Sequence, residues 1–226
     1  MAEQSKLWYL ESFNLFEHMG KVEMEMVEKQ TKMKEITKGE FLYFPEDPST
    51  SVFFLKKGRI KIGSYSEDGR ESIRAVLQPG EIFGELALIG EGKRNDFAQA
   101  VDNEVLVCAM GIEDMERMME GNTRLSLKVT KLLGLRLKRT ETKLNDLLFK
   151  DARQRIIDFV KNLALEEGKK VGDEIMVKHP FTHQDIANLT ASSRQTVTTV
   201  LNELKEQDLL YMERKKFLIR DLSKLK

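Results

Sequence analysis

Hydrophobic residues along the chain recur first at a helical spacing and then in short runs typical of strands. Between Ser12 and Lys34 the apolar positions fit one face of a helix. From about Glu35 to Gly111 short apolar runs alternate with turn residues such as Pro79-Gly80. This texture predicts an antiparallel β unit of sandwich or barrel type. Its predicted strands cover residues 40–44, 52–55, 59–65, 72–77 and 104–110.

A long helix is predicted from about Asn122 to Phe149, because no proline interrupts this stretch. One apolar stripe on it follows steps of four and three residues, the a/d spacing of a two-helix coiled coil. The stripe favours a homodimer, although it also fits packing on the β unit. A second set of apolar residues serves that packing equally well. The stripe consists of Leu133, Leu137, Thr140, Leu144 and Leu147, and the second set of Leu125, Val129 and Leu132.

The C-terminal part predicts a helix-turn-helix. A helix over Ala152–Leu165 and a polar loop over Glu166–Lys170 precede it. Thr182 is a suitable N-cap for the first helix of the motif. After a break near Thr190-Ala191, Ser192 is expected to cap the second helix, with Gln195 at the reciprocal capping-box position.

The second helix of the motif carries side chains suited to reading DNA. Arg194 matches the two acceptors of guanine, and Gln195 matches adenine unless it serves only as a cap. Ser193 and Thr196 are suited to phosphates, whereas Thr198 and Thr199 fit base contact and solvent exposure equally well. Residues 209–212 and 216–219 then predict a β-hairpin wing with a basic tip, and a basic run of this kind also occurs on ordinary solvated surfaces.

Composition narrows the class of protein. A length of 226 residues favours two domains, and 41% hydrophobic with 33% charged residues is typical of a soluble globular chain. No apolar run reaches the length of a membrane span and no secretion signal is present, so we expect a cytoplasmic protein. Because Cys108 is the single cysteine, it forms no internal disulfide or thiolate cluster, and its apolar strand favours a buried inert thiol. The 37 basic and 37 acidic residues balance, so net charge indicates no polyanionic partner.

The segment Phe83–Leu88, preceded by Gln78–Glu81 and followed by Arg94, resembles the phosphate-binding cassette of cyclic-nucleotide domains. Together with Ser193–Val197, it makes nearly the whole chain similar to the Crp/Fnr family of bacterial regulators. The resemblance implies an α+β fold: a double-stranded β-helix of the jelly-roll-like cyclic-nucleotide-binding type, a dimerisation helix and a winged helix-turn-helix. The implied domains are residues 1–121, 122–149 and 150–226.

The resemblance also implies two sites. An effector pocket would contain Gly84, Glu85, Leu86, Arg94, Asn95, Thr140 and Glu141. A DNA interface would contain Thr182, His183, Gln184, Ser193, Arg194, Gln195, Thr196, Thr198 and Thr199.

The pocket departs from the family pattern after its arginine. Asn95 and Asp96 stand where cyclic-nucleotide binders carry a small hydroxyl and an alanine. We expect Asp96 or Glu141 to occupy Arg94 in an internal salt bridge, and therefore weak or no binding of cyclic AMP. Haem requires axial ligands, and His18 is the one candidate ligand among the three histidines. The alternative is that His18 is an ordinary surface residue. The cofactor remains unknown.

These observations favour a sequence-specific transcription regulator that binds a palindromic promoter site as a homodimer. Its expected partners are double-stranded DNA, a second copy, RNA polymerase and a small-molecule effector. The alternative is a ligand-sensing β scaffold that acts through protein partners without DNA. An enzyme is disfavoured, since the sequence has neither a metal-ligand cluster nor a Ser/His/Asp set.

Overall fold

The structure is a computed structural model that describes residues 14–16, 19–213 and 215–225. These residues form two compact units. The first comprises the residues up to 137 except 71–73, and the second comprises 71–73 and the residues from 138 onward. Among the described residues, no helix is both long and apolar enough to span a membrane.

The N-terminal helical part ends earlier than predicted. Its described residues form the 3-10 turn η1 (Asn14–Phe16) and helix α2 (Lys21–Gln30), and strand β1 (Thr31–Ile36) follows α2 without a break. The expectation of a helix reaching Lys34 is therefore wrong. Thr31 is the C-cap in an extended conformation, its hydroxyl donates to the carbonyl of Val27 at 2.9 Å, and the backbone then pairs with β8.

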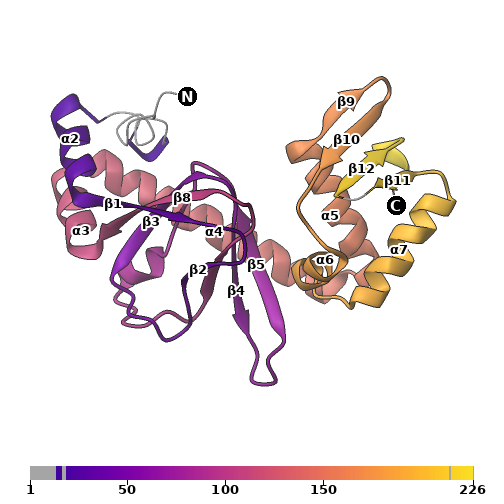
Figure 1. Cartoon of the computed structure of the whole chain (residues 1–226), viewed down its shortest axis with the longest axis horizontal. Coiled ribbons are helices and arrows are strands. Elements are labelled where there is room, and N and C mark those ends of the chain that lie inside the picture. The colour runs from indigo at the N-terminus through magenta and orange to yellow at the C-terminus, as the bar shows by residue number, and fades with distance from the viewer. Residues whose placement is uncertain (1–13, 17–18, 214, 226) are drawn as a thin grey trace. The chain divides into compact units, whose positions relative to one another are not determined.

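Two four-stranded sheets form the core of the first unit (Figure 1). Strand β8 pairs antiparallel with β1 and β3, and β7 pairs antiparallel with β2 and β4. The five predicted strands are present, whereas β1, β6 and β7 were not predicted. One sheet has the order β1, β8 (Val105–Gly111), β3 (Ser51–Lys57), β6 (Ile82–Phe83); the other has the order β2 (Phe41–Tyr43), β7 (Phe97–Ala100), β4 (Ile60–Tyr65), β5 (Glu71–Leu77).

Strand β3 joins two hydrophobic cores, because its side chains alternate between the faces of its sheet. Phe53 and Leu55 pack in the cluster shared with the second sheet. Val52 and Phe54 pack in a separate cluster with the helices, where the rings of Phe16 and Phe54 lie 5.1 Å apart. The covering helices are η1, α2, α3 (Ile112–Gly121) and the first turns of α4 (Thr123–Phe149).

The structure confirms the long helix. It also confirms that some of the apolar residues of this helix pack on the β unit, which is one of the two roles predicted for them. Leu125 and Val129 are buried in the cluster beneath the helices, as expected of the set that packs on the β unit. Helix α3, which lies between β8 and α4, was not predicted.

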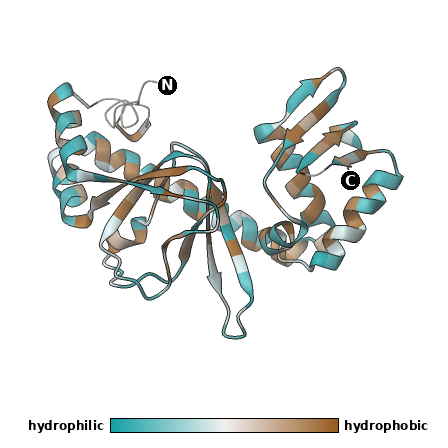
Figure 2. Cartoon of the chain, in the orientation of Figure 1, coloured by the Kyte–Doolittle hydropathy of each residue, from teal (hydrophilic) through white to brown (hydrophobic). Residues whose placement is uncertain are grey.

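The second unit packs three helices on a four-stranded sheet. The apolar faces of the helices share one core with the sheet, and Figure 2 shows hydrophobic and hydrophilic segments alternating along α5 and α7. Its elements are α5 (Ala152–Glu167), α6 (His183–Thr190), α7 (Arg194–Glu206), β9 (Lys169–Val171), β10 (Glu174–Lys178), β11 (Leu210–Glu213), β12 (Lys216–Ile219) and η3 (Leu222–Lys224).

The predicted polar loop over Glu166–Lys170 is almost entirely regular structure. Helix α5 continues to Glu167 and β9 begins at Lys169, which leaves Gly168 as the only residue between them. A Cβ atom at Gly168 would lie 2.1 Å from the carbonyl oxygen of Ala164. The expectation of a loop is therefore wrong, because glycine permits a close turn from helix to strand at this point.

A single residue in the left-handed conformation determines the turn between α6 and α7. Ala191 has φ 48° and ψ 52°, a region in which a Cβ atom is unfavourable. The guanidinium of Arg155 donates to the carbonyls on both sides of this bend, through Nε to Thr190 at 2.8 Å and through Nη2 to Ala191 at 2.9 Å. These two hydrogen bonds from Arg155 stabilise the turn and help to offset the unfavourable positive φ of Ala191.

Replacing Ala191 by glycine should stabilise the protein, because glycine adopts this conformation without the clash. We expect Ala191→Gly to raise the free energy of unfolding by about 1 kcal/mol in urea denaturation. Lys205→Gly is the matched control at an exposed, right-handed position of α7, and it should cost about 1 kcal/mol. Equal losses in the two variants would contradict strain at Ala191.

Candidate functional site

Helix α6 begins at a complete capping box. The Thr182 hydroxyl accepts from the Asp185 amide at 3.1 Å, and the Asp185 carboxylate accepts from the Thr182 amide at 2.8 Å. This confirms Thr182 as the N-cap and satisfies two of the amides that a helix start leaves without partners. His183 and Gln184 consequently occupy the first turn of α6.

Helix α7 begins one residue later than predicted. Ser193, rather than Ser192, is the N-cap, and its hydroxyl accepts from the Thr196 amide at 3.0 Å. Ser192 instead bonds the Thr190 hydroxyl at 2.8 Å, because the bend at Ala191 uses one more residue before the helix. Thr196 therefore holds the position that had been assigned to Gln195, and the capping role predicted for Gln195 is wrong.

One side of α7 is buried and the other is exposed and polar. The buried side fixes the helix in the core of the second unit, and the exposed side presents four of its polar side chains to solvent. The buried residues are Val197, Val200, Leu201 and Leu204, and the exposed ones are Arg194, Gln195, Thr199 and Asn202. This arrangement suits entry of the first turns of α7 into a major groove.

Thr198 differs from these exposed residues because its hydroxyl is engaged within the protein. The hydroxyl donates to the Arg194 carbonyl at 2.9 Å and lies 2.9 Å from Nδ1 of His183 on α6. Thr198 therefore links the two helices of the motif. Sequence reasoning placed both residues at the interface but did not predict the contact between them.

The predicted wing is confirmed as a hairpin of β11 and β12, which pair antiparallel with Glu213 opposite Lys216. At its tip Lys215 has φ 60°, and Lys216 forms an ion pair with Glu213 at 3.3 Å. Arg214, the remaining residue of the predicted basic tip, lies outside the described residues.

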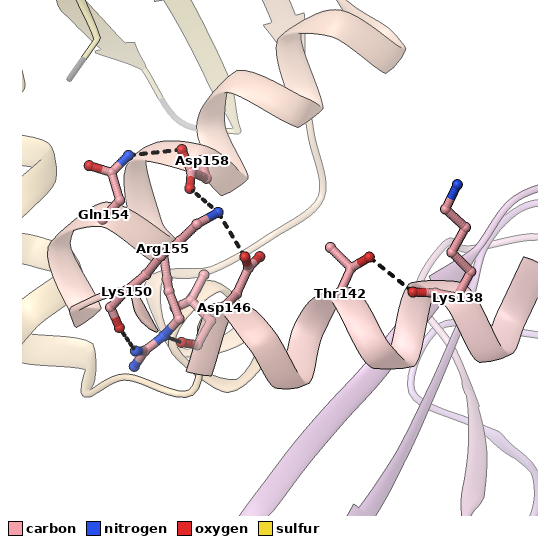
Figure 3. A network of polar contacts seen from close by, with 8 residues as sticks. Lys138, Thr142, Asp146, Lys150, Gln154, Arg155 and Asp158 are labelled. Atoms are coloured by element: carbon pink, nitrogen blue, oxygen red, sulfur yellow. Dashed lines mark hydrogen bonds and ion pairs between the residues drawn. The ribbon is translucent and has the colours of Figure 1, made fainter. Parts of the chain in front are cut away.

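The junction between α4 and α5 is held by charged side chains (Figure 3). The ammonium group of Lys150 lies 2.7 Å from Asp146 on α4 and 2.8 Å from Asp158 on α5. These hydrogen bonds, first to Asp146 and then to Asp158, raise the pKa of Lys150. Arg155 also donates to the Lys150 carbonyl at 2.7 Å, so one side chain ties this junction to the turn at Ala191. The sequence pattern did not indicate this network.

The cassette of the first unit places a buried carboxylate beside a helix. Gly84 has φ 75° and is followed by a short 3-10 helix, η2 (Glu85–Ile89). Glu85 is buried and forms an ion pair with Arg136 of α4, which also donates to the Ile82 carbonyl. The carboxylate of Glu85 is therefore already paired within the chain.

Arg94 is almost completely buried, with 3% of its surface exposed. Its guanidinium donates to the carbonyls of Gly84 at 3.1 Å and Ser51 at 2.5 Å. It also lies over the rings of Tyr43 at 4.7 Å and Phe53 at 5.5 Å, a geometry that stabilises a cation. Gly84 is required here, because a Cβ atom would lie 2.9 Å from the guanidinium.

The salt bridge expected between Asp96 and Arg94 is absent. The Asp96 carboxylate, which is also buried, pairs instead with Arg74 of β5. Burial and then the charge of Asp96 raise the pKa of Tyr43, so this phenol stays protonated. Arg94 is therefore engaged by carbonyls and rings rather than by an acidic residue.

The other predicted pocket residues are divided between the two units. Leu86 is half-buried in η2, and the Asn95 side chain is exposed. Thr140 and Glu141 are exposed on α4 and belong to the second unit. Gly84, Glu85 and Arg94 lie together in the first unit, whereas the contribution of Thr140 and Glu141 to the pocket stays a prediction.

Cys108 is buried in β8, as expected of a structural thiol. In the second unit, His179 is buried against the ring of Phe217, 4.1 Å between centroids. His18 lies outside the described residues, so its proposed role as a ligand is untested. The described part of the chain contains no cluster of three or more metal-ligating side chains.

The predicted coiled-coil stripe on α4 is largely exposed. The exposed fractions of Leu137, Leu144 and Leu147 are 62%, 56% and 49%, whereas Leu133 is half-buried against the core beneath the helices. An apolar stripe of this length is uncommon on a monomeric surface.

Two family profiles match the chain. The cyclic nucleotide-binding domain matches residues 33–122, and the Crp-like helix-turn-helix domain matches residues 154–226. These matches include the cassette and the α6–α7 motif, respectively.

Curated relatives cover most of the chain. The Global nitrogen regulator of Nostoc sp. is 31% identical over 79% of this chain and 80% of its own length. The CRP-like cAMP-activated global transcriptional regulator of Mycobacterium tuberculosis is 28% identical over 87% and 88%. Among solved structures, a CooA mutant from Carboxydothermus hydrogenoformans is 30% identical, with a TM-score of 0.75 and 87% of each chain covered.

Proposed function

Because this chain belongs to the Crp/Fnr family of DNA-binding transcription regulators, we propose that α7 is its reading helix and that the β unit controls it. The observation that carries the proposal is the exposed polar side of α7, whose start is capped and whose turn is fixed. Arg194 and Gln195 on its first turn have the donors that guanine and adenine edges require. Ser193 and Thr196 use their hydroxyls for the cap, so we assign them to positioning and phosphate contact.

We further propose a homodimer formed through α4. The exposed leucines of the stripe would be buried against the same residues of a second copy, as in a two-helix coiled coil. Two-fold symmetry then requires an operator with inverted half-sites. We propose that the protein acts in the cytoplasm and is not an enzyme. We also propose that it contacts RNA polymerase at the promoter.

Arg194 is expected to determine one base in each half-site. Arg194→Ala should weaken binding by about 1 to 3 kcal/mol per half-site and relax the preference at one guanine. Fluorescence anisotropy with a panel of single-base operator variants measures both effects. Lys205→Ala is the matched control, since it removes an exposed cation from the last turn of the same helix.

A loss of affinity that is equal for all operator variants would instead assign Arg194 to a phosphate. If the unmodified protein does not shift promoter DNA in a gel at any salt concentration, the alternative is favoured, in which the β unit is a scaffold that acts through protein partners.

The charged residues of the cassette oppose cyclic AMP as the effector of this protein. A cyclic nucleotide would have to displace Arg136 from Glu85, and its phosphate would meet Arg94 with two donors already engaged. The buried carboxylate of Asp96 adds negative charge near the ring of Tyr43 on which Arg94 lies. Each feature opposes binding of a cyclic nucleotide.

Calorimetry should therefore show no cyclic-AMP binding at micromolar concentrations. The double variant Asn95→Ser, Asp96→Ala restores the hydroxyl and alanine pair of cyclic-nucleotide binders and should bind more tightly than the unmodified chain, because it removes a buried carboxylate and adds a donor. Asn95→Ser alone is the control that retains Asp96. Micromolar affinity in the unmodified protein would refute this account of the pocket.

A further inference from the structure

The apolar stripe of α4 determines which charged residues lie at its two edges. Its steps of four and three residues place Leu133 at a d position and Leu137 at the following a position of the coiled-coil repeat. The residue before an a position is g, the residue after a d position is e, and these two positions flank the seam. Arg136 therefore occupies a g position, and Glu141, which follows Thr140, occupies an e position.

Arg136 lies at the edge of the stripe that is next to the β unit. It follows the buried residue Val129 by seven residues, which is about two turns of the helix. Its guanidinium pairs with Glu85 of the cassette and donates to the Ile82 carbonyl. The Arg136 side chain nevertheless keeps 25% of its surface exposed, so it is engaged within the chain without being enclosed by it.

Glu141 lies at the opposite edge of the stripe. Its side chain is exposed, and it forms no ion pair within the part of the chain that the structure describes. A carboxylate beside an apolar seam is the usual device by which two coiled-coil helices select each other. Glu141 is therefore available to a cation of a second helix.

A parallel pair of helices brings the two edges together. In such a pair, the g residue of one helix lies beside the e residue of the next heptad on the other helix, and opposite charges at these positions form interhelical ion pairs. Glu141 is the e residue that follows Arg136, so each copy offers its Glu141 to Arg136 of the other copy. The next g residue, Lys143, meets the apolar Leu148 instead.

The same charges oppose an antiparallel pair of helices. In that arrangement g residues lie opposite g residues, and both g residues within the stripe, Arg136 and Lys143, are cations. Like charges at this distance repel each other. The charge pattern thus favours the parallel pair, which agrees with a two-fold dimer.

We propose that Glu141 of one copy competes with Glu85 of the other copy for Arg136, so that the second copy contributes a residue to the cassette. One guanidinium charge does not neutralise two carboxylates, and the ion pair to Glu85 weakens as the ion pair between the copies forms. By reciprocity, a ligand that gives Glu85 a hydrogen-bond donor strengthens the dimer. The inference rests on the proposed function, because it assumes the homodimer through α4.

The test is the dissociation constant of the full-length dimer, measured by sedimentation equilibrium at low and constant ionic strength. Glu141→Gln removes two symmetric ion pairs and should weaken the dimer about fivefold, which is modest because exposed ion pairs contribute little. Glu85→Gln removes the competing carboxylate and should strengthen the dimer several-fold. This gain should disappear when Glu85→Gln is combined with Glu141→Gln, because Arg136 then has no carboxylate on the other copy.

A double-mutant cycle isolates the contact between the copies. Glu141→Gln should leave the dissociation constant unchanged in an Arg136→Gln background, because its partner has already been removed. Lys138→Gln is the matched control, since it removes an exposed cation from a b position on the outer side of the same helix. In that background Glu141→Gln should keep its full effect.

Each of three results would overturn the proposal: no effect of Glu141→Gln on the dimer, a full effect of Glu141→Gln in the Arg136→Gln background, or a dimer that Glu85→Gln does not strengthen. Circular dichroism checks that each variant folds. If Glu85→Gln does not fold, Glu85→Asp shortens the competing side chain and should strengthen the dimer in the same direction. A chain that sediments as a monomer at every concentration would instead contradict the proposed homodimer.

Discussion

The three hydrogen bonds of Arg155 are the constraint on which the DNA-binding unit depends. One guanidinium holds the carbonyls of Thr190 and Ala191 at the bend of the motif and the carbonyl of Lys150 at the junction of α4 and α5. Hydrogen bonds from a charged donor are stronger than neutral ones, which helps to offset the unfavourable backbone of Ala191. The direction of α7 is therefore determined partly by Arg155 of α5. This residue lies outside the helix-turn-helix motif, so the motif alone does not reveal it.

The first unit uses its charged groups differently. Glu85, Arg94 and Asp96 are all buried, and each is engaged by a partner within the unit: an arginine of α4, backbone carbonyls and aromatic rings, and an arginine of β5. An effector that binds these three side chains would have to displace their partners within the chain. Because Arg136 belongs to α4, an exchange at Glu85 would act directly on the helix that is proposed to form the dimer.

The sequence predicted the elements that bury a periodic apolar face and failed where a single contact decides the backbone. The long helix, five strands, α6 and the wing followed from periodicity and turn residues. The end of α2 coincides with the pairing of Thr31 with β8, and the start of α7 depends on the left-handed Ala191, neither of which a periodic pattern reveals. In the sites, the family resemblance identified Glu85 and Arg94, and residue type identified Arg194. The partner of Glu85, which is Arg136, and the support that Arg155 gives to the turn between α6 and α7 come from distant segments that one sequence does not pair.

The central claim is that two copies of α7 read inverted half-sites, and selection of binding sites from random double-stranded DNA by the purified full-length protein tests it most directly. The account predicts enrichment of a palindrome whose half-sites are centred about one helical turn, roughly 34 Å, apart. Enrichment of a single unrepeated half-site, or of no sequence at all, would contradict it.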